Sequence, residues 1–477
     1  MAARSPTQKD VMTQLRTLHE APTLLIPDQV LLPTGAQSGH AVLVDGGRIA
    51  AVGPVEAVAA EAPAGVARVE LPNRLLMPGF VDAHHHLTQT FGKSLVFGEP
   101  SEIFQRVWVP MEKHMDAEAV EVATHLAAWE SLRGGFTTVA DAGTRAGVDV
   151  SAIADVTSAV GLRCVLGVIC NDLGGGGRTT DLAEVVAAAE RHLSRWDADG
   201  LVHPSVAISI PEAATDDALV VITSLAREAG VPFQTHLNEH LAAVERSLVA
   251  SGERPLERLA RLSALGPELL AAHATLLTPR EIRLLGEAGS AISYNPVASS
   301  WKGNSVAPAL LMHELGMRVG LGTDGTRSDA FRLLDAAETA QRLTWGMDVG
   351  DSSSGGGWTW LEQGLRGGAD AVGLAGSIGE IAVGAHADLL VVNLGVPEFV
   401  PSWDVPWELV RIANRDQIDA VIVAGRLRLE GGWPVDWDGQ ALLDRAREVS
   451  ERVVSNSSIT LVDPPASTHR ETWMNER

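Results

Sequence analysis

Four side chains with metal-binding chemistry stand where strand-like runs end. His84 and His86 close PGFVDAHHH, His236 ends FQTHL, and Asp324 ends VGLGTD. Because alternate residues of a strand point to the same side, His84 and His86 can share a site while His85 faces away. An HxH pair alone could equally be two exposed histidines. Three imidazoles and one carboxylate, however, form a ligand set suited to a divalent ion, so the joint pattern predicts a metal centre.

Two further residues could move protons beside such a centre. Glu239 follows His236 by three residues, and His273 ends the run LLAAHAT. A divalent ion lowers the pKa of its bound water towards about 7, and Glu239 could then pass a proton from that water to a departing nitrogen. The alternatives are a solvated carboxylate at a helix start for Glu239 and a histidine satisfied in the core for His273.

The elements that must position these residues read as a barrel. Between Pro78 and about Gly376, eight apolar runs alternate with longer amphipathic stretches: FVDAHHH, TTVADA, CVLGVIC, VAISI, FQTHL, LLAAHAT, AISYNP and VGLGTDG. This alternation is typical of an α/β fold of the (β/α)8 TIM-barrel type, whose chemistry lies at the carboxyl ends of the strands. We therefore expect a barrel over residues 78–376.

The two chain ends are predicted to build a second unit. Short β-like runs fill residues 22–77 and again 377–435, and we expect them to meet in one small β-sandwich outside the barrel. Residues 1–21 show helical spacing (Val11, Leu15, Leu18) and are predicted to be an arm that packs on the body or on another subunit. Residues 436–477 read as a helix, over about 440–455, followed by a polar tail.

Composition narrows the possible partners. The 477 residues include 37 basic and 60 acidic ones, a net charge of -23 without any basic stripe, which argues against nucleic acid. No apolar run is long enough for a membrane span and no secretory signal opens the sequence, so we expect a cytoplasmic protein without membrane contact. Cys164 and Cys170 read as buried, reduced thiols. The expected partners are a small-molecule substrate and further copies of the chain.

Together, PGFVDAHHH, the HxxE of His236 and Glu239, the AHA around His273 and the GTDG around Asp324 resemble the amidohydrolase superfamily, from about Pro22 through the 420s. The sequence is most similar to the branch with cytosine and guanine deaminases and triazine hydrolases. The resemblance implies a metal-bound water as nucleophile and Glu239 as proton shuttle.

Metal stoichiometry follows from the same resemblance. Binuclear relatives need a lysine at the end of strand four, and SVAISIPEAA has none. We therefore expect one divalent ion per chain, zinc before iron, cobalt or manganese, held by His84, His86, His236 and Asp324. His273 then acts electrostatically or in acid-base catalysis, and Asp324 can also accept a proton.

Strand seven departs from the deaminase pattern. Tyr294 stands where those relatives carry a histidine, and the following Pro-x-Ser-Asn turn is replaced. We predict substrate contacts from this loop and from the loop after strand one; the alternatives are plain packing for Tyr294 and a loop core for the aromatic residues. The predicted substrate-binding residues are Tyr294, Trp301, Lys302, Gln89, Phe91 and Trp108. A glycine run from Gly174 to Gly177, with Arg178, reads as a mobile loop near the mouth.

Three functions remain open at this point. The first is hydrolysis of a linear C–N bond in an amide, urea or (thio)carbamate that carries an apolar group, as in phenylurea and molinate hydrolases. The changed strand-seven motif and the aromatic loop after strand one favour it. The second is deamination of a purine, pterin, pyrimidine or triazine ring, which the branch resemblance favours. The third is a non-catalytic scaffold, which the intact ligand pattern disfavours.

Overall fold

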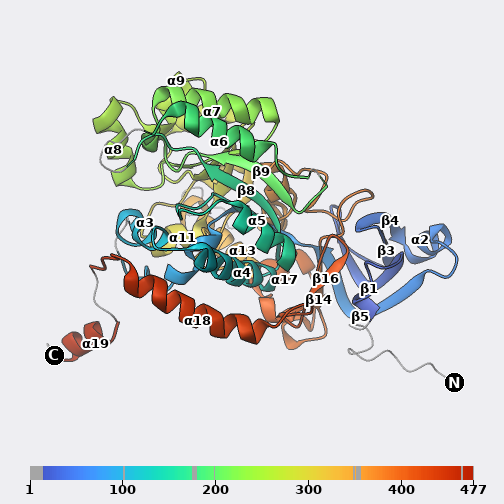
Figure 1. Ribbon diagram of the computed structural model, residues 1–477. Helices are drawn as coiled ribbons and strands as arrows, with labels where there is room; N and C mark the ends of the chain where they lie inside the picture. Colours follow the sequence, from blue (N-terminus) through green and yellow to red (C-terminus); the bar gives the residue numbers. More distant parts are fainter. Residues whose placement is uncertain are drawn as a thin grey trace.

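A parallel sheet with its strands in chain order forms the centre of the molecule (Figure 1). The computed structural model describes residues 14–99, 103–174, 180–197, 199–346, 350, 356–462 and 466–475. Within these residues the sheet has eight strands, and all of its pairs are parallel. The strands are β6 (Phe80–His85), β7 (Phe136–Asp141), β8 (Arg163–Ile169), β9 (Val202–Ala207), β10 (Phe233–Leu237), β11 (Leu269–His273), β12 (Ala291–Tyr294) and β13 (Arg318–Leu321).

The first and last strands of this order meet, which closes the sheet into a barrel. The backbone N–H of Asp324, just after β13, donates to the carbonyl oxygen of His84 at 3.0 Å. Helices follow the strands and cover the outside of the sheet (Figure 1). The predicted barrel is therefore confirmed. The helices are α4 (Ala117–Arg133), α5 (Ser151–Val160), α6 (Leu182–Leu193), α7 (Asp216–Ala229), α8 (Leu241–Ser251), α9 (Pro255–Arg261), α10 (Pro279–Glu287), α11 (Pro296–Trp301), α12 (Ala309–Glu314), α13 (Ala330–Gln341), α15 (Trp358–Gly364) and α16 (Arg366–Ala371).

Local sequence signals explain where these helices begin and end. The Thr215 hydroxyl accepts a hydrogen bond from the Ala218 N–H at the start of α7, and Gly230, with a φ of 67°, ends that helix. At α10 a reciprocal capping box joins Thr278 to Glu281. Such caps satisfy backbone groups that the first and last turns leave unpaired.

Both chain ends contribute to a second sheet, as predicted. In the described residues it has nine strands in one mixed sheet, with β5 between β1 and β14. A buried ion pair between Arg163 of β8 and Asp388, at 2.9 Å, ties this sheet to the barrel. The strands are β1 (Thr23–Leu32), β2 (Gly35–Ser38), β3 (His40–Asp45), β4 (Arg48–Pro54), β5 (Ala67–Pro78), β14 (Leu389–Asn393), β15 (Ile418–Val423), β16 (Arg426–Glu430) and β17 (Trp433–Pro434), with helices α2 (Val55–Glu61) and α17 (Val405–Arg411) between them.

The terminal segments pack on the body. Leu15 and Leu18 of the predicted arm are buried in the core of the mixed sheet, whereas Val11 lies outside the described residues. Helix α18 (Gly439–Asn456) confirms the predicted C-terminal helix and lies against α4, and α19 (Ala466–Asn475) follows it (Figure 1). None of the helices in the described ranges is long and apolar enough to cross a membrane. The predicted homo-oligomer stays a prediction.

Candidate active site

Imidazole and carboxylate groups converge at the carboxyl end of the barrel. His84, His236, His273 and Asp324 each offer one ligand atom, and these four atoms lie within 4.8 Å of one another. His86 Nε2 is 3.2 Å from His236 Nε2 and 3.6 Å from Asp324 Oδ1. The five side chains come from β6, β10, β11 and the turn after β13, as the strand-end pattern predicts.

The chemistry of these groups fits a divalent ion. His236 Nδ1 donates to the Ser209 carbonyl oxygen at 2.7 Å, which leaves the lone pair of its Nε2 facing His86. Burial, together with the neighbouring His84, holds the pKa of His86 and of His236 well below the usual value, so both rings are neutral. His84 Nε2 is buried and has no hydrogen-bond partner among the described residues. Imidazole nitrogens that face one another and a carboxylate in this way form a ligand set suited to a metal.

Hydrogen bonding separates His273 from the ligands. The Asn295 amide accepts from Ser293 Oγ at 2.7 Å and presents its NH2 group to His273 Nδ1 at 3.3 Å. The remaining proton of the neutral His273 ring therefore lies on Nε2, which faces Glu239 Oε1 at 3.8 Å. A protonated nitrogen donates and does not coordinate, so this arrangement favours the predicted set of His84, His86, His236 and Asp324 and leaves His273 as a donor.

One buried carboxylate, Asp82, holds the two sides of the site together. Its Oδ1 accepts from the backbone N–H groups of His84 and Thr323, at 3.2 and 2.9 Å. Its Oδ2 accepts from His85 Nδ1 at 3.0 Å and from the Thr323 hydroxyl at 2.5 Å. Asp82 thus fixes the end of β6 relative to Asp324, and His85 faces away from the cluster, as predicted.

The backbone is strained at two of the site residues. His273 has a φ of 70° and Asp324 a φ of 61°, the left-handed region that side chains other than glycine rarely occupy. Such residues persist only where the surrounding contacts over-determine them, and they cluster at functional sites.

Lys302 lies between the two carboxylates of the site. Its Nζ is 2.8 Å from Glu239 Oε1 and 2.6 Å from Asp324 Oδ2. Although burial pushes the pKa of Glu239 upward, His273 and the Lys302 ammonium outweigh it and hold that pKa far below the usual range. Glu239 is therefore ionised and able to accept a proton. Lys302 belongs to the site, where its ammonium contacts the carboxylates of Glu239 and Asp324.

A cavity of about 340 Å³ opens directly on these groups. Its wall includes Gln89, Trp108 and Lys302, three of the predicted substrate-binding residues. Phe104, one of the aromatic residues of the loop after strand one, also lines it, whereas the sequence interpretation missed Gln105, Arg145 and Arg246. Arg145 is held by Glu112 at 3.0 Å and Ser209 at 3.1 Å, and it stacks over the Phe104 ring. Its place four residues after the end of β7 was the only sequence signal for it.

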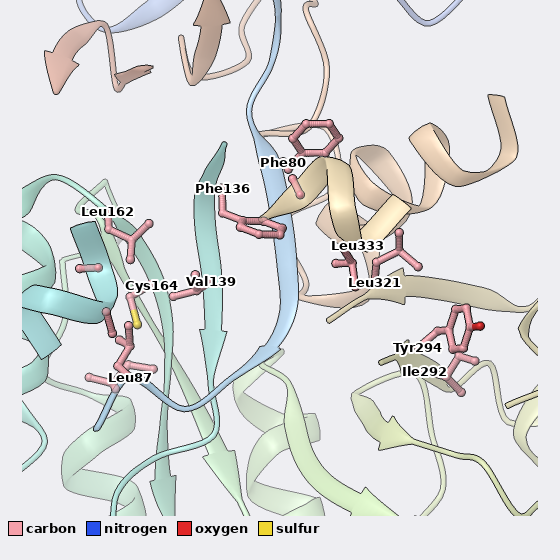
Figure 2. Close-up of a cluster of buried hydrophobic side chains, with 14 of the residues drawn as sticks. Phe80, Leu87, Phe136, Val139, Leu162, Cys164, Ile292, Tyr294, Leu321 and Leu333 are labelled. Atoms are coloured by element: carbon pink, nitrogen blue, oxygen red, sulfur yellow. The ribbon is translucent and has the colours of Figure 1, made fainter. Parts of the chain in front are cut away.

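Tyr294 is not a substrate contact, which corrects the sequence interpretation. The side chain is fully buried, and its hydroxyl accepts from Gln341 Nε2 at 3.1 Å. Figure 2 shows Tyr294 beside Ile292, its neighbour on the same face of β12, in the hydrophobic cluster. Ser293 and Asn295 face the barrel interior instead, because a Cβ on Gly322 would meet both of them and the Cβ of His84.

Two other predicted contacts also lie away from the cavity wall. Phe91 and Trp301 are partly buried and pack against the main hydrophobic core. The alternative of a loop core therefore fits Phe91. In the predicted glycine loop, residues 175–179 lie outside the described residues.

Comparison with known proteins shows which family this chain resembles. A model of the amidohydrolase family matches residues 75–428. The 5-methylthioadenosine/S-adenosylhomocysteine deaminase of Syntrophobacter fumaroxidans is 31% identical over 415 residues, 87% of this chain and 92% of that protein. A zinc-bound crystal structure of an adenosine deaminase from Xanthomonas campestris superposes with a TM-score of 0.84 at 29% identity, covering 91% of this chain and 99% of the other.

A more distant structure shares the fold. The zinc complex of atrazine chlorohydrolase from Arthrobacter aurescens TC1 has a TM-score of 0.78 at 20% identity, over 90% of this chain and 100% of that one. The predicted likeness to phenylurea or molinate hydrolases is not supported. The relatives favour the second of the three functions, ring deamination, over cleavage of a linear C–N bond.

Proposed function

This chain belongs to the amidohydrolase family, and we propose that it is a zinc-dependent aminohydrolase that releases ammonia from the exocyclic amino group of an adenine nucleoside. The observation that carries the proposal is the likeness, over nearly the whole chain, to deaminases of such nucleosides. The case for a linear substrate rested on Tyr294, the changed turn after it and the aromatic loop, and it is weakened because the Tyr294 side chain is buried in the core.

The cavity wall supports a flat heterocyclic substrate. Phe104 and Trp108 offer aromatic surfaces on which a base can stack, and Gln89 and Gln105 offer amide groups for its polar edge. The volume of about 340 Å³ lies at the compact end of ordinary ligand pockets, about 300–1,000 Å³. A wall of this mixed character suits a nucleoside better than a purely apolar urea or carbamate.

The reaction adds water to the ring carbon that carries the amino group and breaks the C–N bond, giving the oxo-purine nucleoside and ammonia. A divalent ion held by His84, His86, His236 and Asp324 would supply, when bound, a water made acidic enough to ionise near neutral pH. Glu239 takes a proton from the attacking water and delivers it to the departing nitrogen. His273 donates from Nε2 towards the reacting centre, and Lys302 balances the charge of the two carboxylates.

The test is a substrate panel with the zinc-loaded protein. Adenosine, 5′-deoxyadenosine, 5′-methylthioadenosine and S-adenosylhomocysteine are compared with a phenylurea and a thiocarbamate, with free ammonia and organic amine assayed in parallel. We expect ammonia from at least one nucleoside, at a rate that is lower by a factor of about 10² or more with Glu239→Gln, which controls for a contaminating deaminase. Amine release from the linear compounds with no ammonia from any nucleoside would refute the proposal.

A further inference from the structure

One wall of the cavity belongs to a loop that is held by the far end of the chain. We call residues 93–99 and 103–108, between β6 and α4, the pocket-wall loop. Ile103, Phe104, Gln105 and Trp108 of this loop line the cavity. Arg106, between them, points away from the cavity and meets the segment after α18 instead. The loop therefore has a substrate side and a tail side.

The tail side is made of paired backbone contacts. The Thr460 N–H donates to the Arg106 carbonyl oxygen at 2.9 Å, and Arg106 Nη1 donates back to the Thr460 carbonyl oxygen at 3.2 Å. The Val462 N–H donates to both carboxylate oxygens of Glu99, at 3.2 and 3.1 Å. Arg106 also pairs with Glu99 at 2.5 Å. Glu99, only 4% exposed, therefore joins both ends of the loop to the tail.

The tail is itself anchored on the barrel. Helix α18 runs along α4 in Figure 1, and Arg452 pairs with Asp116 at 3.2 Å and with Glu118 at 2.9 Å. Val449 and Val453 on the same helix are buried, and Ile459 packs against the main core. The tail thus leaves a fixed helix and returns to the loop with little freedom.

We propose that residues 459–462 are a positioning strap that sets the substrate-facing wall of the cavity through Glu99 and Arg106. The inner side of this segment is held in the main core by Val96, Ile103 and Val107, and residues 104–108 form a π-helical turn. On its outer side, hydrogen bonds to a second segment raise the free-energy cost of local opening. The strap touches no metal ligand and no proton shuttle. Its loss therefore weakens substrate binding and leaves the chemical step intact.

Matched proline and alanine variants test the strap in the full-length, zinc-loaded protein. Val462→Pro removes the backbone N–H that donates to Glu99. Val462→Ala keeps this N–H and only shortens a side chain that is 55% exposed. Thr460→Pro and Thr460→Ala repeat the comparison at the other contact. Hydrogen exchange is followed for residues 103–108, with β7 as the internal reference for global stability, and kinetics are measured on the best substrate.

We expect both proline variants to speed hydrogen exchange in residues 103–108 about fivefold, the factor that corresponds to the net free energy of one hydrogen bond. Exchange in β7 should stay unchanged. KM should rise by a similar factor at constant kcat, and the alanine variants should match wild type. Equal exchange in proline and alanine variants, or equally faster exchange in β7, would overturn the proposal. The exchange measurement needs no substrate, so it stands even if the proposed deaminase activity fails.

Discussion

Replacing Asp82 by asparagine tests how the metal centre is held. The asparagine oxygen can still accept from the backbone N–H groups of His84 and Thr323, but the amide nitrogen cannot accept from His85 or the Thr323 hydroxyl. Hydrogen bonds to a charged acceptor are worth roughly 1.5–3 kcal/mol each. His85 Nδ1 lies 2.9 Å from the Thr323 hydroxyl, so the two groups that lose the carboxylate can hydrogen-bond to each other and recover part of that free energy.

The net cost should appear mainly as weaker metal binding, because the lost contacts hold His85 and Thr323, the sequence neighbours of His84 and Asp324. Removing a partner that orients a metal ligand typically costs about 10–100-fold in metal affinity. We expect zinc affinity of Asp82→Asn, measured by competition with a chromophoric chelator, to fall within that range. Thr323→Val removes the same hydroxyl contact, so the double variant should be less than additive.

A second buried acid provides the control. Asp388→Asn disturbs the Arg163 pair between the barrel and the mixed sheet, away from the metal ligands. It should lower the melting temperature of the apo-protein and leave zinc affinity unchanged. Zinc affinity within twofold of wild type in Asp82→Asn, or an equal loss in Asp388→Asn, would refute this reasoning.

Three further predictions concern catalysis, metal content and pH. Glu239→Gln should keep its zinc and lose about 10²–10⁴-fold in kcat, measured by ammonia release, since the amide cannot shuttle a proton. Elemental analysis should find close to one divalent ion per chain, reduced by His84→Ala but not by His273→Ala; two tightly bound ions would contradict the ligand assignment. Burial and the neighbouring Arg163 lower the pKa of His203 to about 4, from 6.5. The unfolded chain therefore binds a proton between pH 6.5 and 4 that the folded chain does not, so the melting temperature should fall over that window, and less steeply in His203→Gln.

That the proposed metal ligands lie close together could be predicted from the sequence, because they follow strand geometry. Parallel strands of a barrel all end at the same face, so residues at the ends of β6, β10 and β13 must converge wherever their side chains point inward. His84 and His86 satisfy this by alternation. The same rule, applied to β12, places Ser293 and Asn295 inside and Tyr294 outside. Strand seven has only four residues, and each of its two faces carries a hydroxyl group, on Ser293 or on Tyr294, so its sequence alone did not reveal which alternate residues face the site.

The cavity wall could not be predicted in the same way. Arg145 lies in a loop, and Arg246 lies within α8, where helix periodicity does not indicate what lies across a cavity. Lys302 stood out as one of four lysines, but only the folded chain brings its ammonium against both Glu239 and Asp324. These contacts join segments that no local pattern relates.

The mixed sheet has a consequence for the order in which the nascent chain can fold. Strand β5 pairs on one side with β1 and on the other with β14, and the whole barrel is encoded between β5 and β14. While ribosomes are still producing the barrel, β5 therefore presents an open hydrogen-bonding edge, the kind of surface on which chains associate wrongly. Gly79 alone separates β5 from β6, so the first barrel strand leaves directly from this unfinished sheet. A chain that stops before β14 would keep that edge exposed, which makes translation of the last segment the step that protects the protein from aggregation.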